Sequence, residues 1–147
     1  MSFDLSAFLP YQLAVASARV SRAFANRYRV EFGLTNPEWR VLAHLAQSGS
    51  VSMREIQARV DMDKSKVSRA ATRLEQAGLI EKRANSDDKR LPDVRLTLAG
   101  QDMIGRILPV AEAFQAELIA MLAQDAPACT AALLRLGNGK WALNLDG

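Results

Sequence analysis

The chain has 147 residues, of which 49% are hydrophobic and 24% are charged, with a net charge of +3. This apolar content is sufficient for a packed core and excludes an intrinsically disordered chain. The positive charge is uneven, because residues 51–100 contain 11 Lys and Arg against 8 Asp and Glu, whereas residues 101–147 contain 3 against 5. A polyanionic partner would therefore bind the first two-thirds of the chain.

Several features argue against a secreted protein, a membrane protein and an enzyme. Cys129 is the only cysteine, so it forms neither an internal disulfide nor a thiolate metal cluster, which suits a reducing cytoplasm. The first residues lack the basic segment and apolar core of a signal peptide, and no run approaches about 18 apolar residues. His44 and Cys129 leave no visible pair of nucleophile and base. We expect a cytoplasmic protein without membrane contact, cofactor, metal site or catalytic activity.

Two helices are predicted in the first third of the chain. Residues 7–31 have apolar side chains at helical spacing, with Pro10 in the first turn, and Gly33 ends the pattern. A second helix is predicted to be capped by Thr35 or Asn36, with Pro37 at its first position, and to stop at residues 48–49.

A short helix and a basic helix follow. Residues 50–52 are long enough for only a short strand, and Ser52 is predicted to cap the third helix, with Glu55 at the capping-box spacing. The fourth helix begins after Asp63 and ends at Gly78, in the C′ position that favours glycine. Its buried stripe is predicted to comprise Val67, Ala71 and Leu74.

The opposite face of the fourth helix combines cations with short hydroxyl side chains. Cations bind phosphates, and an arginine can donate twice to a guanine edge in the major groove. Taken alone, such a face is also typical of an ordinary solvated helix. The candidate DNA-contacting residues on this helix are Ser65, Lys66, Ser68, Arg69, Thr72 and Arg73.

A two-stranded ribbon is predicted next. Val94, Leu96 and Leu98 alternate with polar residues, which indicates one buried face, and residues 79–83 are the expected partner strand. The intervening loop contains Lys89 and Arg90 and would project from the body, unless it is only a polar turn. The order of short helix, turn, basic helix and ribbon predicts a winged helix-turn-helix for duplex DNA.

The last third of the chain is helical and apolar. A fifth helix is predicted from about 98 to 124, capped by Thr97 and bent at Pro109, and a sixth from Pro127 to about 136. The apolar positions of the fifth helix cover more than one stripe, so this helix needs a partner surface. Residues 141–145 are apolar enough that we expect them to dock.

The order and spacing of these segments resemble the MarR family of multiple-antibiotic-resistance-type regulators. The resemblance extends over nearly the whole chain. It rests on Leu34-Thr35, Trp39 and Val41-Leu42, then on Asp63 to Arg69, Leu74-Glu75 and Gly78 to Ile80, and finally on Asp87 to Arg90, Val94, Leu96-Thr97 and Gly100.

The resemblance implies a mainly α fold with a small β wing. Residues 1–32 and 99–147 would form a helical dimerisation lobe, and residues 33–98 the DNA-binding region. Recognition helices of a homodimer would enter successive major grooves of a pseudo-palindrome. Arg90 would read the minor groove from the wing tip, held by Asp88, while Lys89 would attract phosphate.

The family also implies a pocket for a small aromatic or phenolic effector between the two lobes. The candidate effector-binding residues are Arg22, Trp39, Arg40 and His44. For His44 the alternative is a structural histidine, and for Cys129 a small packing residue is favoured over a thiol sensor.

These expectations together describe a ligand-responsive repressor that acts as a homodimer on a pseudo-palindromic operator. The alternative is a winged-helix protein that binds DNA without sequence preference, as an architectural factor, or that binds other proteins.

Overall fold

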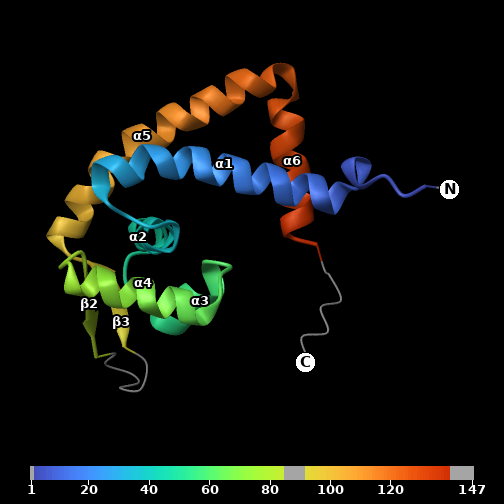
Figure 1. The fold of residues 1–147 in the computed structure, drawn as a ribbon. Helices are drawn as coiled ribbons and strands as arrows, with labels where there is room; N and C mark the ends of the chain where they lie inside the picture. The colour runs from blue at the N-terminus through green and yellow to red at the C-terminus, as the bar shows by residue number, and fades with distance from the viewer. Residues whose placement is uncertain (1, 85–91, 140–147) are drawn as a thin grey trace, which may run out of the picture. The chain divides into compact units, whose positions relative to one another are not determined.

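The computed structural model describes residues 2–84 and 92–139. Its α-helices are α1 (Leu9–Phe32), α2 (Asn36–Ser48), α3 (Met53–Arg59), α4 (Lys64–Gln76), α5 (Leu98–Leu122) and α6 (Ala126–Gly137). Its strands are β1 (Val51–Ser52), β2 (Ile80–Arg83) and β3 (Asp93–Leu96), and single 3-10 turns span Leu5–Ala7 and Ala123–Asp125. The predicted fold class, mainly α with a small β wing, is confirmed (Figure 1).

Local capping signals set where the helices begin. The Thr35 side chain accepts from the Glu38 backbone, and the Glu38 carboxylate accepts from the Thr35 backbone, which closes a capping box. Because Thr35 is the cap, α2 begins at Asn36, and Pro37 lies one position later than predicted. Ser52 and Asp63 cap α3 and α4 as predicted.

The end of α4 is tied to the start of α5. Gly78 has φ +75°, and the amides of Gly78 and Leu79 donate to the carbonyls of Glu75 and Leu74, which is a Schellman motif. The Thr97 hydroxyl donates to the Gly78 carbonyl at 2.6 Å and accepts from the Gly100 amide at 3.1 Å. The predicted cap of α5 therefore also joins α5 to the loop that follows α4.

The three strands form an antiparallel sheet in the order β1-β3-β2. Val51 pairs with Val94, and Ile80 pairs with Leu96. The strand ends at Leu96, so the prediction that Leu98 belongs to the buried face of the ribbon is wrong. Leu98 is the first residue of α5 and its side chain is 83% exposed.

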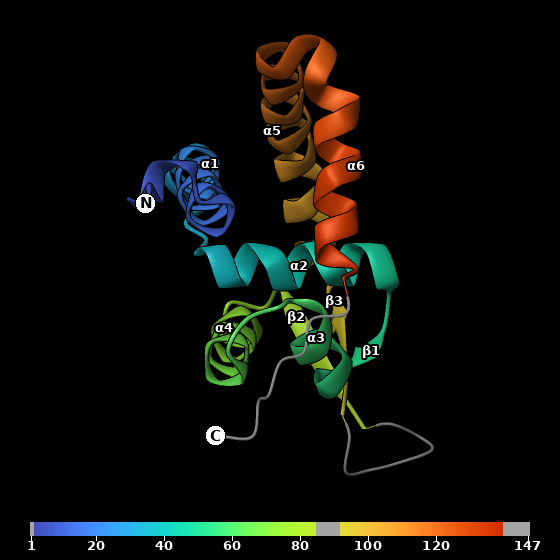
Figure 2. The same cartoon turned by 90° about the vertical axis from the view of Figure 1, so that its right-hand side faces the viewer.

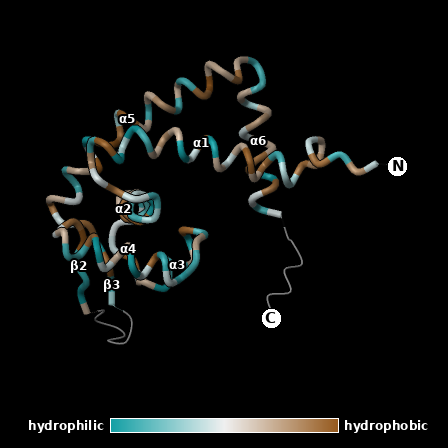
Figure 3. The backbone as a smooth tube through the Cα atoms, in the orientation of Figure 1, coloured by the Kyte–Doolittle hydropathy of each residue, from teal (hydrophilic) through white to brown (hydrophobic). Residues whose placement is uncertain are grey.

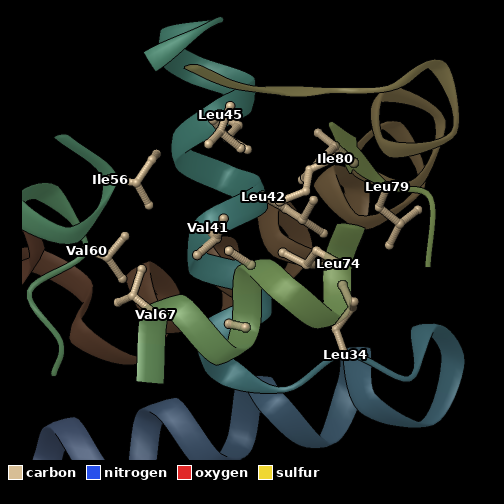
Figure 4. Close-up of a cluster of buried hydrophobic side chains, with 14 of the residues drawn as sticks. Leu34, Val41, Leu42, Leu45, Ile56, Val60, Val67, Leu74, Leu79 and Ile80 are labelled. Atoms are coloured by element: carbon tan, nitrogen blue, oxygen red, sulfur yellow. The ribbon is translucent and has the colours of Figure 1, made fainter. Parts of the chain in front are cut away.

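One hydrophobic core holds the helix-turn-helix together. Val67 and Leu74 of α4 face Val41 and Leu42 of α2, and Ile56 of α3 closes one side (Figure 4). The predicted buried stripe of α4 is confirmed, with Ala70 as a further member. Figures 1 and 2 show α2 lying between α1 and α4, so α2 is the scaffold on which α4 rests.

The chain divides into two compact units, one up to Ala111 and one from Glu112 onward. The division falls in α5, two residues after Pro109, which lies inside the helix and cannot donate a backbone hydrogen bond. The expected docking of residues 141–145 lies outside the described residues.

The stretch Leu98–Gly137 is apolar yet little buried. Only 11% of its most apolar segment is buried. Figure 3 shows brown and tan segments along much of α5. By length and composition alone this stretch could cross a membrane. The sequence did not predict this, because polar residues interrupt the apolar ones. Helices that pack in an oligomer have the same composition.

Candidate nucleic-acid interface

A tight turn sets the position of α4 relative to α3. Asp61, in this turn, has φ +53°, a left-handed conformation that aspartate tolerates better than most residues. Asp63 then caps α4, its Oδ1 accepting from both the amide and the hydroxyl of Ser65 at 3.0 Å. These hydrogen bonds lower the pKa of Asp63, and the charges of Lys66 and Arg69 lower it further. The first turn of α4 therefore keeps an ionised carboxylate beside its cations.

The six candidate residues of α4 fall into two groups. Residues advance by about 100° each around a helix, so Ser65, Arg69 and Thr72 project opposite the buried stripe. All three are exposed, as is Lys66 at the margin of that face. Gln76 also lies on this outward face and is exposed. Its position follows from the helical spacing, yet it was missed as a candidate.

Ser68 and Arg73 lie on the two flanks of α4 and contact other helices. The Ser68 hydroxyl accepts from the Gln57 side chain of α3 at 3.0 Å. Arg73 Nε donates to Glu38 Oε1 of α2 at 2.7 Å, and the Arg73 side chain is 50% exposed. These two residues therefore each make a hydrogen bond to another helix, although Arg73 remains half exposed. Ser65, Lys66, Arg69 and Thr72 are all exposed.

The two outward hydroxyls already donate their hydrogens. Ser65 donates to Asp63 Oδ1, and Thr72 donates to the Ser68 carbonyl at 3.0 Å. A hydroxyl oxygen also has two lone pairs that accept. The outward face of α4 thus offers donors on Arg69 and Lys66, and acceptors on Ser65 and Thr72.

Ion pairs brace the base of the wing. Glu81 of β2 contacts Arg95 across the sheet, where the two residues are register partners, and Arg83 at 3.3 Å. The hydrogen bond from Arg95 is the main reason that the pKa of Glu81 is lowered, and Arg83 adds to it. The predicted wing residues Asp88, Lys89 and Arg90 lie outside the described residues.

The four effector candidates lie on two different helices, α1 and α2. Arg22 lines a small hollow of about 300 Å³ with residues of α1 and Asn36, whereas Trp39, Arg40 and His44 are half-buried along α2. Trp39 packs against Phe24, with ring centroids 5.4 Å apart.

Sequence reasoning missed Tyr28, which lies beside this aromatic pair. Its ring is fully buried, and its hydroxyl makes no hydrogen bond within the part of the chain that the structure describes. Burial raises the pKa of this phenol. No sequence pattern distinguishes Tyr28, because its partners Phe24 and Trp39 come from two helices. In the described ranges, no group of three or more His, Cys, Asp or Glu side chains is placed to hold a metal ion.

Comparison with known proteins identifies the family. Residues 32–91 match the sequence profile of the MarR family. The HTH-type transcriptional regulator YwoH of Bacillus subtilis is 32% identical over 104 residues, which are 71% of this chain and 75% of that protein. The chain belongs to the MarR family. The HTH-type transcriptional repressor MdtR of the same organism is 33% identical over 93 residues, which are 63% of this chain. The chain spans 60% of the length of MdtR.

Solved structures extend the likeness over almost the full chain. A MarR family regulator from Silicibacter pomeroyi is 27% identical, with a TM-score of 0.79 over 93% of this chain and 100% of that one. BpsR from Bordetella bronchiseptica, whose DNA binding is regulated by 6-hydroxynicotinic acid, is 21% identical, with a TM-score of 0.84 over 95% and 100% of the two chains. The relatives are transcriptional regulators and not enzymes, as the sequence led us to expect.

Proposed function

We propose that this MarR family chain is a cytoplasmic, sequence-specific regulator that binds duplex DNA and represses transcription. The observation that carries the proposal is the outward face of α4, where Ser65, Lys66, Arg69 and Thr72 project from a helix supported by a core on its other side. A helix presented in this way fits the major groove. The name of the relative MdtR, a repressor, supports the direction of regulation.

The hydrogen-bonding character of this face indicates which bases it would read. Arg69 can donate twice to the O6 and N7 of a guanine. Ser65 and Thr72, whose hydrogens are engaged within α4, would accept from the amino group of cytosine or adenine. Lys66 at the margin would bind phosphate. Arg90, Lys89 and Asp88 remain proposed wing contacts on the strength of the sequence alone.

We propose a homodimer formed by residues 1–32 and 99–147, with residues 33–98 as the DNA-binding region. The described terminal regions expose large apolar side chains that a single chain leaves in water. Those that are more than half exposed are Phe3, Leu9, Val30, Met121, Leu133 and Leu134, at 52–90% exposure. A two-fold dimer would bury such side chains and place two copies of α4 about one DNA turn, roughly 34 Å, apart.

A small aromatic or phenolic effector would regulate this dimer. Arg22, Trp39, Arg40 and His44 remain the proposed contacts, and the buried hydroxyl of Tyr28 joins them because an unsatisfied hydroxyl gains from a polar ligand. The case of BpsR and 6-hydroxynicotinic acid supports this class of ligand. The effector would act by preferring a dimer with the wrong spacing between the two α4 helices.

Footprinting on the DNA upstream of the gene, followed by competition with random duplex, tests the proposal. A regulator should prefer its specific site by about 10³-fold or more at fixed salt. Arg69→Gln should remove much of this preference. Arg106→Gln, which takes one exposed arginine from an ion pair in α5, should keep it. Equal affinity for specific and random duplex would instead favour an architectural winged-helix protein, and no DNA binding would favour a protein-interaction module.

A further inference from the structure

The carboxylate of Glu38 joins the start of α2 to the flank of α4. Its Oε2 accepts from the Thr35 amide at 3.1 Å and closes the cap of α2, while its Oε1 accepts from Arg73 Nε at 2.7 Å. The Glu38 side chain is only 9% exposed. A buried carboxylate needs such partners, because removing one leaves a charge without compensation. The two hydrogen bonds therefore tie α4 to the one point of α2 where the backbone is fixed by a capping box.

The opposite flank of α4 is held as well. Ser68 accepts from Gln57 of α3, so polar contacts lie on both sides of the outward face. The buried stripe between them consists of Val67, Ala70, Ala71 and Leu74. Only Leu74 is a long side chain, and the other three are short, so they pack closely but present little shape to resist rotation about the helix axis. A charge-assisted hydrogen bond from one flank has the directionality that these side chains lack.

We infer that Arg73 and Glu38 form a positioning pair that sets the rotation of α4 about its own axis, and with it the aim of Arg69 and Thr72 at base edges. Arg73 is then not a DNA contact. A rotation of about 20° would move a side-chain tip by roughly 2 Å, at a radius of about 5–6 Å. Such a displacement is enough to break a bidentate contact with a base, while phosphate contacts tolerate it. The inference rests on the proposed DNA binding.

The Glu38→Gln variant separates the two roles of Arg73 by the sign of its effect. If Arg73 positions α4, Glu38→Gln lowers the ratio of specific to random affinity by about tenfold or more, with little change in random affinity. If Arg73 binds phosphate, its release from Glu38 strengthens binding to both duplexes. Arg73→Lys is the complement. If Arg73 positions α4, Arg73→Lys should lower the ratio of specific to random affinity. If Arg73 binds phosphate, Arg73→Lys should bind both duplexes like the wild type, since lysine retains the charge.

The salt dependence of DNA affinity provides a second measurement, and a purely structural role of Arg73 would not change it. Loss of a phosphate contact in Arg73→Gln would reduce the slope of log K against log salt by about 0.9, whereas loss of a positioning residue leaves the slope unchanged. Arg106→Gln is the matched control, because it also breaks an arginine–carboxylate pair but lies in α5. All variants are compared well below their unfolding temperatures. If Glu38→Gln does not fold, the test uses Arg73→Lys and Arg73→Gln instead, because both keep the Thr35–Glu38 cap.

The outcomes for the proposed function and for this inference are distinct. A wild-type chain without sequence preference overturns the proposed function. A wild-type chain with preference that Glu38→Gln and Arg73→Lys retain overturns the inference alone. Where the wild type shows no sequence preference, residual dipolar couplings of the α4 amides still test whether Glu38 and Arg73 set the rotation of α4. An unchanged orientation of α4 in Glu38→Gln overturns it, and a rotated helix supports it.

Discussion

Gly100→Ala should destabilise the protein, although alanine is normally the better residue in a helix. Gly100 lies in the first turn of α5, where an added Cβ would be 2.1 Å from the Leu79 carbonyl oxygen and 3.2 Å from a methyl carbon of Leu96. Carbon and oxygen in non-bonded contact need about 3.3 Å, so α5 or the Leu79 carbonyl must move by about 1 Å. That carbonyl accepts from the Thr97 amide at 3.1 Å and cannot move without loss of this hydrogen bond.

The size of the effect follows from two opposing contributions. Relief of the glycine penalty in a helix stabilises by about 0.5–1 kcal/mol. Overpacking against a fixed backbone group costs about 1–3 kcal/mol, and the upper half of this range applies because the contact is with backbone. The net loss should be about 1–2.5 kcal/mol. It would be measured by urea denaturation followed by circular dichroism, at one protein concentration because a dimer's stability depends on it.

Gly105→Ala is the matched control for this prediction. Gly105 lies in the same helix, but an added Cβ there has no neighbour within 4 Å. It should therefore show only the propensity gain of about 0.5–1 kcal/mol. If Gly100→Ala proves as stable as Gly105→Ala, the close approach of α5 to Leu79 is not present in solution, and the account of this junction is wrong.

Three further changes test other parts of the fold. Gly78→Ala should cost about 1 kcal/mol of the free energy of unfolding, because φ there is +75° and left-handed backbone strains a side chain; Gly78→Asn should cost less. Asp63→Ala should lower the unfolding temperature at pH 7. Because the pKa of Asp63 is lowered in the folded state, the wild-type advantage is fully present above the unfolded pKa of about 3.9 and should be lost as the pH falls from there through the lower folded pKa. Leu134→Glu should give monomers in sedimentation and weaken DNA binding, since it places a charge in the proposed dimer interface. Leu98→Glu, at a more exposed site outside the proposed interface, should leave the dimer intact.

The features that the sequence predicted correctly are those set by neighbours along the chain. Thr35, Ser52 and Asp63 cap helices because their side chains reach amides two or three residues away, and Gly78 ends α4 because of its own φ. The buried stripe of α4 likewise follows from helical spacing. These signals were sufficient to locate the helix-turn-helix and the strands of the wing.

The features that the sequence could not predict depend on residues that are distant along the chain. The sequence predicted Arg73 as a DNA contact, which stays a prediction, but it did not show that Arg73 donates to Glu38, 35 residues earlier. Ser68 is likewise engaged by Gln57. A hydrophobic pattern does not include such partners, which appear only when the chain is folded.

The junction at Thr97 has a consequence for how the wing can change. Thr97 joins Gly78, Leu79 and Gly100 at the base of the segment that contains β2 and β3, so this segment leaves and returns at one fixed point. Residues added or removed between the two strands would not alter the relation of α4 to α5. The hairpin between β2 and β3, which we propose as a DNA contact, can therefore be redesigned in length while the geometry of α4 stays the same.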